Sequence, residues 1–457
     1  MKEREKTLFE DSPVLEAIVR LAFPTVIGQI ILVLYNMADT FFIGLTGSDA
    51  MITAATVCMP AFMFLQAISN LFGVGGASVI SRALGARDLQ RAKDTASFAF
   101  WGCAAVTVLY SLGAWLFAGP FVDLLGGSNP LVHDYAVEYL TFTVVIGGLA
   151  TSLNALLAHL VRSEGRSLQA SIGVALGGVM NIALDPLFMF VILPRGYETL
   201  GAAIATVVSQ AVSALLCMNY IRHSQVLIIT KQDWKLDGQC CKQLLGMGLP
   251  MGLQYSITAI GSILLQTGIN GLGSHAVAAV STGNKVTQVI CCPLDALGTT
   301  VATYGGQNIG AKKLDRISKG MVSCLLFGTI YSIMAFFIIF YFGPVLLGLF
   351  IGPEETAVIA QAQYFIVHWM AFCVPLMMVN VFRFMIQGLG FSKLAVFSGV
   401  FEMLARGLIS LFWIPAAGFE AVCYASPVAW IAADVFLIPA YLGVMKKLRR
   451  DLSVTAG

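Results

Sequence analysis

The sequence predicts an all-α integral membrane protein with twelve transmembrane helices in two homologous six-helix halves. Composition, recurring apolar runs and an internal repeat indicate this fold. Of the 457 residues, 58% are hydrophobic and 11% are charged, whereas a soluble globular chain carries about 25% charged residues. These charged residues are too few to cover the water-exposed surface of a soluble protein of this size. A soluble protein is therefore excluded.

Twelve apolar segments are long enough to cross a bilayer. They are centred near residues 30, 68, 106, 146, 180, 211, 257, 293, 330, 371, 402 and 434. Of the 27 Lys and Arg residues, 24 fall in seven segments between alternate spans: the N-terminal segment with Arg20, 82–93, 162–166, 222–242, 312–319, 383–393 and 446–450. The positive-inside rule places these segments and both termini in the cytoplasm, which requires an even number of spans.

An internal repeat relates the two halves. Residues 73–91 (GVGGASVISRALGARDLQR) and 298–316 (GTTVATYGGQNIGAKKLDR) align without gaps at an offset of 225, with six of nineteen positions identical. At an offset of 226, TGSDA (46–50) aligns with LGSHA (272–276). Each half has an even number of spans, so both insert with the same orientation, as in the parallel repeats of some secondary transporters.

The repeat and the charge pattern set the predicted domain boundaries. We expect a cytoplasmic N-terminus (1–13), an N-lobe of helices 1–6 (14–222), a cytoplasmic linker (223–241), a C-lobe of helices 7–12 (242–446) and a cytoplasmic tail (447–457).

Helix 1 carries an acid at membrane depth. Asp39 lies within the apolar run LVLYNMADTFFIG, where an ionised carboxylate is costly unless it is paired, solvated or protonated. Tyr35 and Asn36 precede it by four and three residues, which places all three on one helix face.

Helices 5 and 6 supply further polar groups. The motif NIALDP places Asn181 and Asp185 at i and i+4, and Pro186 frees a backbone carbonyl one turn earlier. Helix 6 opens with the small-residue run GAAIAT, which permits close packing and offers the hydroxyl of Thr206.

These groups predict a shared polar pocket in the first half. Two carboxylates, an amide and a hydroxyl suit one Na⁺ or protons, because burial and mutual repulsion favour protonation of at least one carboxylate. Asp39, Asn181 and Asp185 are metal ligands only if the ion is Na⁺. Alternatively, each acid caps a broken backbone or faces water near a helix end.

The second half also contains intramembrane charges. Glu402 and Arg406 stand at i and i+4 in helix 11, either as a self-neutralising structural pair or with a role in binding or gating. Arg406 is the basic residue that we place well inside a span. Asp295 follows Pro293 and is a candidate cavity residue, and Asp434 has no evident local partner.

The sequence carries no enzyme or ATPase signature. It contains no GxxxxGK[ST], HExxH or GxSxG motif, and its ten cysteines show no CxxC or zinc-ligand spacing. We therefore expect neither catalysis nor a cofactor besides a coupling ion.

Five segments together resemble the multidrug and toxic compound extrusion (MATE) family: LAFPTVIGQIILVLYNMADTFFIGLTGSDA, NIALDP, GAAIAT, GLPMGLQYS and YGGQNIGAKKLDR. The resemblance covers about residues 14–446. It implies a V-shaped pair of lobes that exports drugs and organic cations against inward H⁺ or Na⁺. It also implies a cation site at Asp39, Asn181, Asp185 and Thr206.

One departure from the family concerns helix 7, where some branches carry an acid after the LP motif. Here GLPMGLQYSITAIGS has none, and Gln254 and Tyr255 stand near that place. The resemblance therefore implies a prokaryotic branch whose ion coupling rests on the first half, with Gln254 as a candidate cavity or gating residue beside Tyr35, Asn36, Asp295, Glu402 and Arg406.

Two other functions are considered. A lipid or lipid-linked oligosaccharide flippase of the wider superfamily favours a cavity rich in Arg and Lys. A membrane-embedded enzyme or receptor is disfavoured by the missing catalytic motifs and by the duplication. As partners we expect small-molecule drugs or organic cations and membrane lipid, with no nucleic acid, and we expect a monomer.

Overall fold

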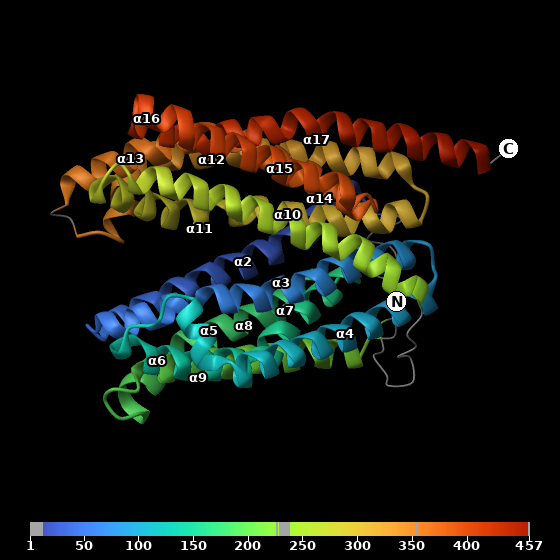
Figure 1. Cartoon of the computed structure of the whole chain (residues 1–457). Helices are drawn as coiled ribbons and strands as arrows, with labels where there is room; N and C mark the ends of the chain where they lie inside the picture. The colour runs from blue at the N-terminus through green and yellow to red at the C-terminus, as the bar shows by residue number, and fades with distance from the viewer. Residues whose placement is uncertain (1–11, 225–226, 228–237, 353–354, 456–457) are drawn as a thin grey trace. The chain divides into compact units, whose positions relative to one another are not determined.

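The computed structural model describes residues 12–224, 227, 238–352 and 355–455, and within these ranges every regular element is a helix. Figure 1 shows the helices coloured along the chain. Most of the predicted linker (223–241) and of the predicted N-terminal segment (1–13) lies outside the described residues.

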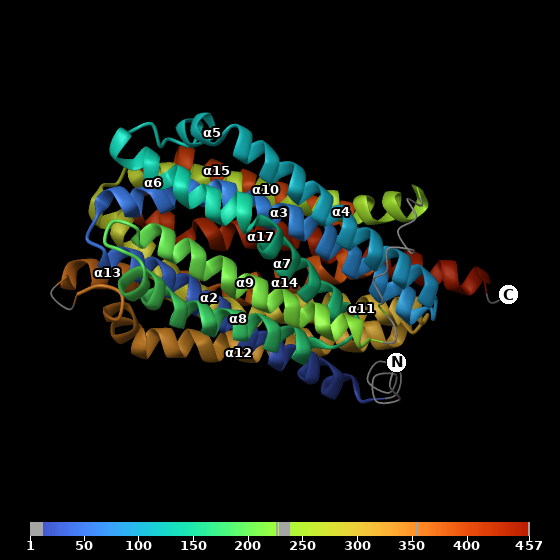
Figure 2. The ribbon, with the colours of Figure 1, turned by 90° about the horizontal axis from the view of Figure 1, so that it is seen from below.

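The first compact unit contains Phe23–Gly248. Its α8 and α9 run side by side (Figures 1 and 2), and small residues line the contact between them. The elements are α2 (Val14–Leu45), α3 (Asp49–Gly85), α4 (Leu89–Leu116), α5 (Ala118–Leu124), α6 (Pro130–Leu140), the π-helix η1 (Thr141–Ile146), α7 (Gly148–Ser163), α8 (Ser167–Pro186), the π-helix η2 (Leu187–Ile192) and α9 (Glu198–Arg222).

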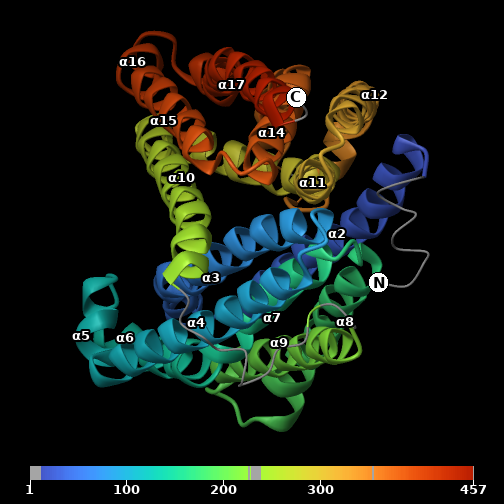
Figure 3. The same cartoon turned by 90° about the vertical axis from the view of Figure 1, so that its right-hand side faces the viewer.

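The second compact unit contains Leu249–Gly457 together with the start of the described chain up to Ala22. In Figure 3 its helices are seen nearly end-on, with α14, α15 and α17 packed together. The elements are α10 (Gly238–Asn270), α11 (Ser274–Gly310), α12 (Leu314–Gly348), α13 (Thr356–Ala371), α14 (Cys373–Gly388), α15 (Ser392–Leu408), the π-helix η4 (Ile409–Trp413), α16 (Ile414–Ala417) and α17 (Phe419–Thr455).

The structure confirms the internal repeat. The bounds of α3 and α11 differ by 225 positions, as do those of α7 and α14 and the first residues of α8 and α15. The turns after α3 and α11 place Arg87 and Lys312 at φ of 61° and 60°. This left-handed conformation is uncommon for residues other than glycine, so its recurrence indicates two copies of one design.

The helices are long and apolar enough for a membrane. Among the described residues, nine helices pass a length and hydropathy test, and two bent pairs bring the number to eleven. The bends are 49° between η1 and α7 and 51° between α13 and α14. The remaining long helix, α11, has 37 residues but is more polar. All twelve predicted centres therefore fall on helices.

The boundary between the units lies inside two helices. It falls between Ala22 and Phe23 in α2, and between Gly248 and Leu249 in α10. Pro24 and Pro250 lie close to these positions. The lobe boundaries that the sequence predicts, 14–222 and 242–446, remain predictions.

Candidate functional site

The candidate site of the first unit lies where α2, α8 and α9 meet. Gly178 of α8 allows α2 to approach closely, because a Cβ there would lie 2.8 Å from Ile31 Cγ2 and 3.3 Å from Tyr35 Cδ1. Gly177 serves α9 in the same way, since its Cβ would lie 2.9 Å from Ser213 Cβ. Small residues at helix contacts are the usual means of close packing in membranes.

Four of the residues singled out from the sequence come together here. The Asn181 amide nitrogen donates to Asp185 Oδ1 at 3.3 Å and to Thr206 Oγ1 at 3.4 Å. Asp39 reaches this group from α2, and its carboxyl group interacts with the side chains of Asp185, Thr206 and Asn181. Asp185 and Asn181 are fully buried, whereas Asp39 is half-buried.

The oxygens of this cluster are not all satisfied within the protein. Asp39 Oδ1, Asn181 Oδ1 and Asp185 Oδ2 are buried and have no hydrogen-bond partner. Such atoms are costly unless something binds them, and oxygen donors suit protons and hard cations. No group of three or more His, Cys, Asp or Glu side chains suited to a metal occurs among the described residues, so the cluster offers only two carboxylates.

Tyr35 joins a second polar network beside the cluster. Gln210 donates to the Tyr35 hydroxyl at 3.2 Å and accepts from Asn154, and Ser213 donates to Asn154 at 2.6 Å. A cavity of about 10 Å³ lies against this network, which is roughly the space of one water molecule. Asn36 takes no part, because it is exposed and its amide donates to the Leu32 carbonyl.

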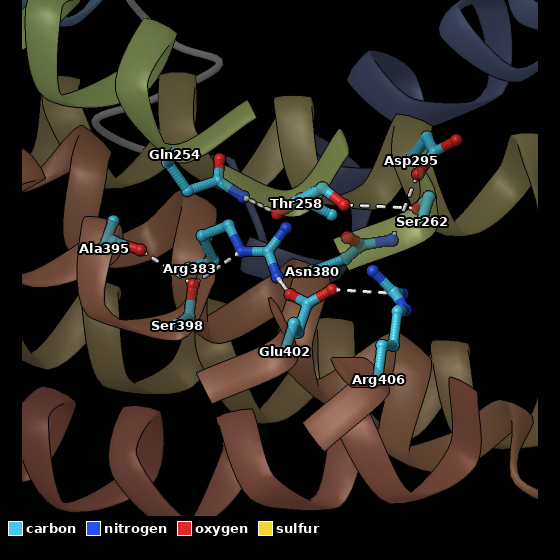
Figure 4. Close-up of polar contacts among 10 residues, drawn as sticks. All are labelled: Gln254, Thr258, Ser262, Asp295, Asn380, Arg383, Ala395, Ser398, Glu402 and Arg406. Atoms are coloured by element: carbon cyan, nitrogen blue, oxygen red, sulfur yellow. Dashed lines mark hydrogen bonds and ion pairs between the residues drawn. The ribbon is translucent and has the colours of Figure 1, made fainter. Parts of the chain in front are cut away.

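A buried network of charges occupies the second unit, as Figure 4 shows. Glu402 of α15 binds Arg383 of α14 through one oxygen and Arg406 through the other, the latter at 3.3 Å. Arg383 also donates to Ser398 Oγ at 3.1 Å. Asp434 of α17 interacts electrostatically with Arg383 and Glu402. The predicted pair of Glu402 and Arg406 is therefore part of a larger network.

A cavity of about 510 Å³ adjoins this network, within the volume range of small-molecule sites. Asp295, Glu402 and Arg406 line it, and Asn380 donates to Asp295 at 3.1 Å. Gln254 does not line it; this buried side chain donates to Thr258 at 3.2 Å.

Sequence reasoning missed Arg383 and Asn380. The positive-inside count placed Arg383 in a cytoplasmic segment and left Arg406 as the basic residue inside a span, but both lie within helices and are buried. Arg383 lies near the end of α14 and is buried, and its apolar neighbours Phe382 and Phe384 are the signal that could have found it. Its assignment to a cytoplasmic segment stays a prediction. Asn380 had no such signal.

Membrane-spanning repeats that bury polar groups suited to ions and small molecules are typical of transport proteins. A profile of the MatE family matches residues 24–187 and 250–411, one stretch in each half. The chain belongs to the MatE family, whose members are transporters and not enzymes.

Relatives and solved structures agree with this assignment. The multidrug export protein MepA of Staphylococcus aureus (strain NCTC 8325 / PS 47) is 25% identical over 419 residues, which cover 89% of this chain and 85% of MepA. The MepA of Staphylococcus saprophyticus is 24% identical over 412 residues with the same coverage.

The solved structures show the fold. An outward-facing multidrug resistance MATE transporter of the MOP superfamily aligns with a TM-score of 0.88 over 98% of this chain and 99% of its own, at 22% identity. A MOP superfamily transporter from Pyrococcus furiosus, described for the reverse polarity of its binding pocket, aligns with 0.86 over 98% of each chain, also at 22%. The twelve-helix, two-lobe membrane fold predicted from the sequence is thus confirmed.

Proposed function

We propose that this chain is a multidrug efflux antiporter of the cytoplasmic membrane, which exports drugs or organic cations in exchange for inward H⁺ or Na⁺. Family membership and the two MepA relatives support drug export. The observation that carries the coupling proposal is the convergence of Asp39, Asn181, Asp185 and Thr206 around three unpartnered oxygens.

The chemistry of the cluster suits a single small cation. A proton on Asp39 or Asp185 would let that carboxyl group donate to the other, whereas two ionised carboxylates could only accept. Na⁺ could instead take the free oxygens of Asp39, Asn181 and Asp185, with the Thr206 hydroxyl as a fourth ligand. Both occupants offset the repulsion between the two acids, and no further cofactor is proposed.

Coupling then requires that ion and drug favour different states of the transporter. Only differential affinity shifts an equilibrium between states. Occupation of the cluster would favour the state that releases drug outside, and drug binding from the cytoplasm would favour the opposite state. We further propose that both termini are cytoplasmic and that the chain works as a monomer.

The test is efflux of a cationic dye from proteoliposomes under separately imposed pH and Na⁺ gradients. Asp39→Asn and Asp185→Asn should each abolish gradient-driven efflux, and the gradient that drives the wild type identifies the ion. The exposed residue Asp134 offers a matched control, since Asp134→Asn makes the same change away from the site. Full gradient-driven efflux in both site variants would contradict the proposal.

A lipid or lipid-linked oligosaccharide flippase is the second candidate, and it is less well supported. Pyrophosphate carries several negative charges and needs several cationic groups. Glu402 offsets one of the two charges of Arg383 and Arg406, so this network offers at most one positive charge.

A further inference from the structure

We propose that the cavity of the second unit is a binding site for aromatic carboxylates, with Arg406 as the group that holds the carboxylate. The inference deepens the proposed function by naming a second substrate class. It rests on that function only where it takes the bound compound to be a transported substrate. Asp39 and its neighbours belong to the other unit and take no part.

Arg406 has unused binding capacity. Its side chain is 9% exposed and lines the cavity, and its Nη1 is buried without a hydrogen-bond partner. Its Nη2 is engaged by Glu402 at 3.3 Å. A buried guanidinium nitrogen without an acceptor is costly, and a carboxylate is the acceptor that guanidinium geometry fits best.

The acids nearby do not use this nitrogen. Glu402 contacts Arg383 through one oxygen and Arg406 Nη2 through the other, so each of its oxygens already has a guanidinium partner. Asp295 is held by the Asn380 amide on the cavity wall and is exposed to the cavity. Figure 4 shows Asp295, Asn380 and Arg406 turned toward one space. Arg406 and Lys285 are the cations of the cavity lining, and Lys285 is exposed.

Aromatic side chains form part of the apolar cavity wall, beside aliphatic residues such as Leu265 and Val422. Trp369 and Trp430 pack edge to face with their centroids 4.6 Å apart, and Phe365 lines the same cavity. Such walls favour flat aromatic ligands. The volume of about 510 Å³ admits a drug-sized molecule. The occupant is therefore an aromatic compound with one carboxylate.

The test compares 2-naphthoate with its neutral primary amide, 2-naphthamide, by equilibrium dialysis against the full chain in lipid nanodiscs, with empty nanodiscs subtracted. The wild type should bind the acid about tenfold to a hundredfold more tightly than the amide, as expected for a charge-assisted contact. Arg406→Gln should remove most of this preference, mainly by lowering the affinity for the acid. Lys285→Gln deletes the same charge at an exposed place and should keep most of the preference.

Three results would overturn the proposal: equal binding of acid and amide by the wild type, an unchanged preference in Arg406→Gln, or an equal loss in Lys285→Gln. If Arg406→Gln fails to fold, Arg406→Lys keeps the charge but loses the planar fork, so it must lower the preference several-fold. No ion gradient is applied. Acid-selective binding by a chain that fails in the efflux assay would therefore contradict only the proposed function.

Discussion

The two halves repeat one scaffold but differ in charge at their polar centres. The helices α7 and α14, and the first residues of α8 and α15, correspond at an offset of 225. At that offset, the charged residues of the second unit correspond to small or neutral residues of the first: Arg383 to Ala158, Glu402 to Gly177 and Arg406 to Asn181.

This difference separates two ways of keeping a carboxylate inside a membrane protein. Glu402 has two fixed guanidinium partners within its own unit. Asp39 and Asp185 have an amide and a hydroxyl beside them, and no cationic side chain among the described residues contacts their carboxylates. A carboxylate with two fixed guanidinium partners needs no ion, whereas two acids without a cationic partner must take one from solution. We therefore propose the first unit as the place for the coupling ion.

The largest effect should follow from giving the first unit the charge of the second. Asn181→Arg places a permanent cation beside Asp39 and Asp185, so the coupling ion is excluded. At 4 Å and an effective dielectric constant near 20 the repulsion is about 4 kcal/mol, or on the order of 10²-fold to 10³-fold in ion affinity. Gradient-driven dye efflux should fall to background.

Asn181→Gln is the matched control for this change, because it keeps the amide and adds no charge. It should retain measurable efflux. Ion-driven efflux at the wild-type rate in Asn181→Arg would show that the ion binds elsewhere.

The second unit should lose stability when its central acid, Glu402, is removed. Glu402→Gln removes the carboxylate that contacts both Arg383 and Arg406 and leaves Asp434 as the acid that interacts with Arg383, which should lower the free energy of unfolding by about 3–5 kcal/mol. Thermal unfolding of the purified chain in detergent measures this change. Arg406→Gln is the comparison variant, because Glu402 keeps Arg383 and the loss should be smaller. Equal unfolding temperatures for Glu402→Gln and the wild type would contradict the network.

A smaller effect should come from adding a methyl group where α2 and α8 pack closely. In Gly178→Ala, the new methyl group would lie 2.8 Å from Ile31 Cγ2, and the overpacking should cost about 1–3 kcal/mol and displace Tyr35. Gly113→Ala is the matched control, since a Cβ there meets nothing within 4 Å. It should be neutral or stabilising by up to about 1 kcal/mol. Thermal unfolding of both variants measures the two effects. Equal shifts of the unfolding temperature would contradict the close contact between α2 and α8.

The smallest effects should distinguish two neighbours on α2. Tyr35→Phe removes the hydroxyl that accepts from Gln210, at a cost of about 0.5–1.5 kcal/mol. Asn36→Ala changes an exposed side chain, so unfolding should shift by less than about 0.5 kcal/mol. A larger loss in Asn36→Ala than in Tyr35→Phe would place Asn36, and not Tyr35, in the polar network.

Most of the fold follows from local features of the sequence, because hydropathy marks the spans and the repeat fixes their grouping. The association of Asn181 with Asp185 was also predictable, since i and i+4 share a helix face. The shared pocket of Asp39 with these two residues was predicted because intramembrane polar groups need partners, and the family resemblance implied the same site.

Two features could not be predicted from the sequence. The charge network joins Arg383 to Glu402, nineteen residues apart on different helices, and no local rule predicts such a pair. The free Nη1 of Arg406 depends on where Glu402 directs its two oxygens. Both are properties of packing.

The central claim is that one coupling-ion site exists in the first unit. Two measurements on the purified chain test it most directly: calorimetric titration detects Na⁺ binding, and proton release in weak buffer detects bound H⁺. The wild type should show one saturable ion-binding event per chain, and Asp39→Asn and Asp185→Asn should each abolish it, whereas Asp134→Asn should not. An undiminished event in both site variants would contradict the account.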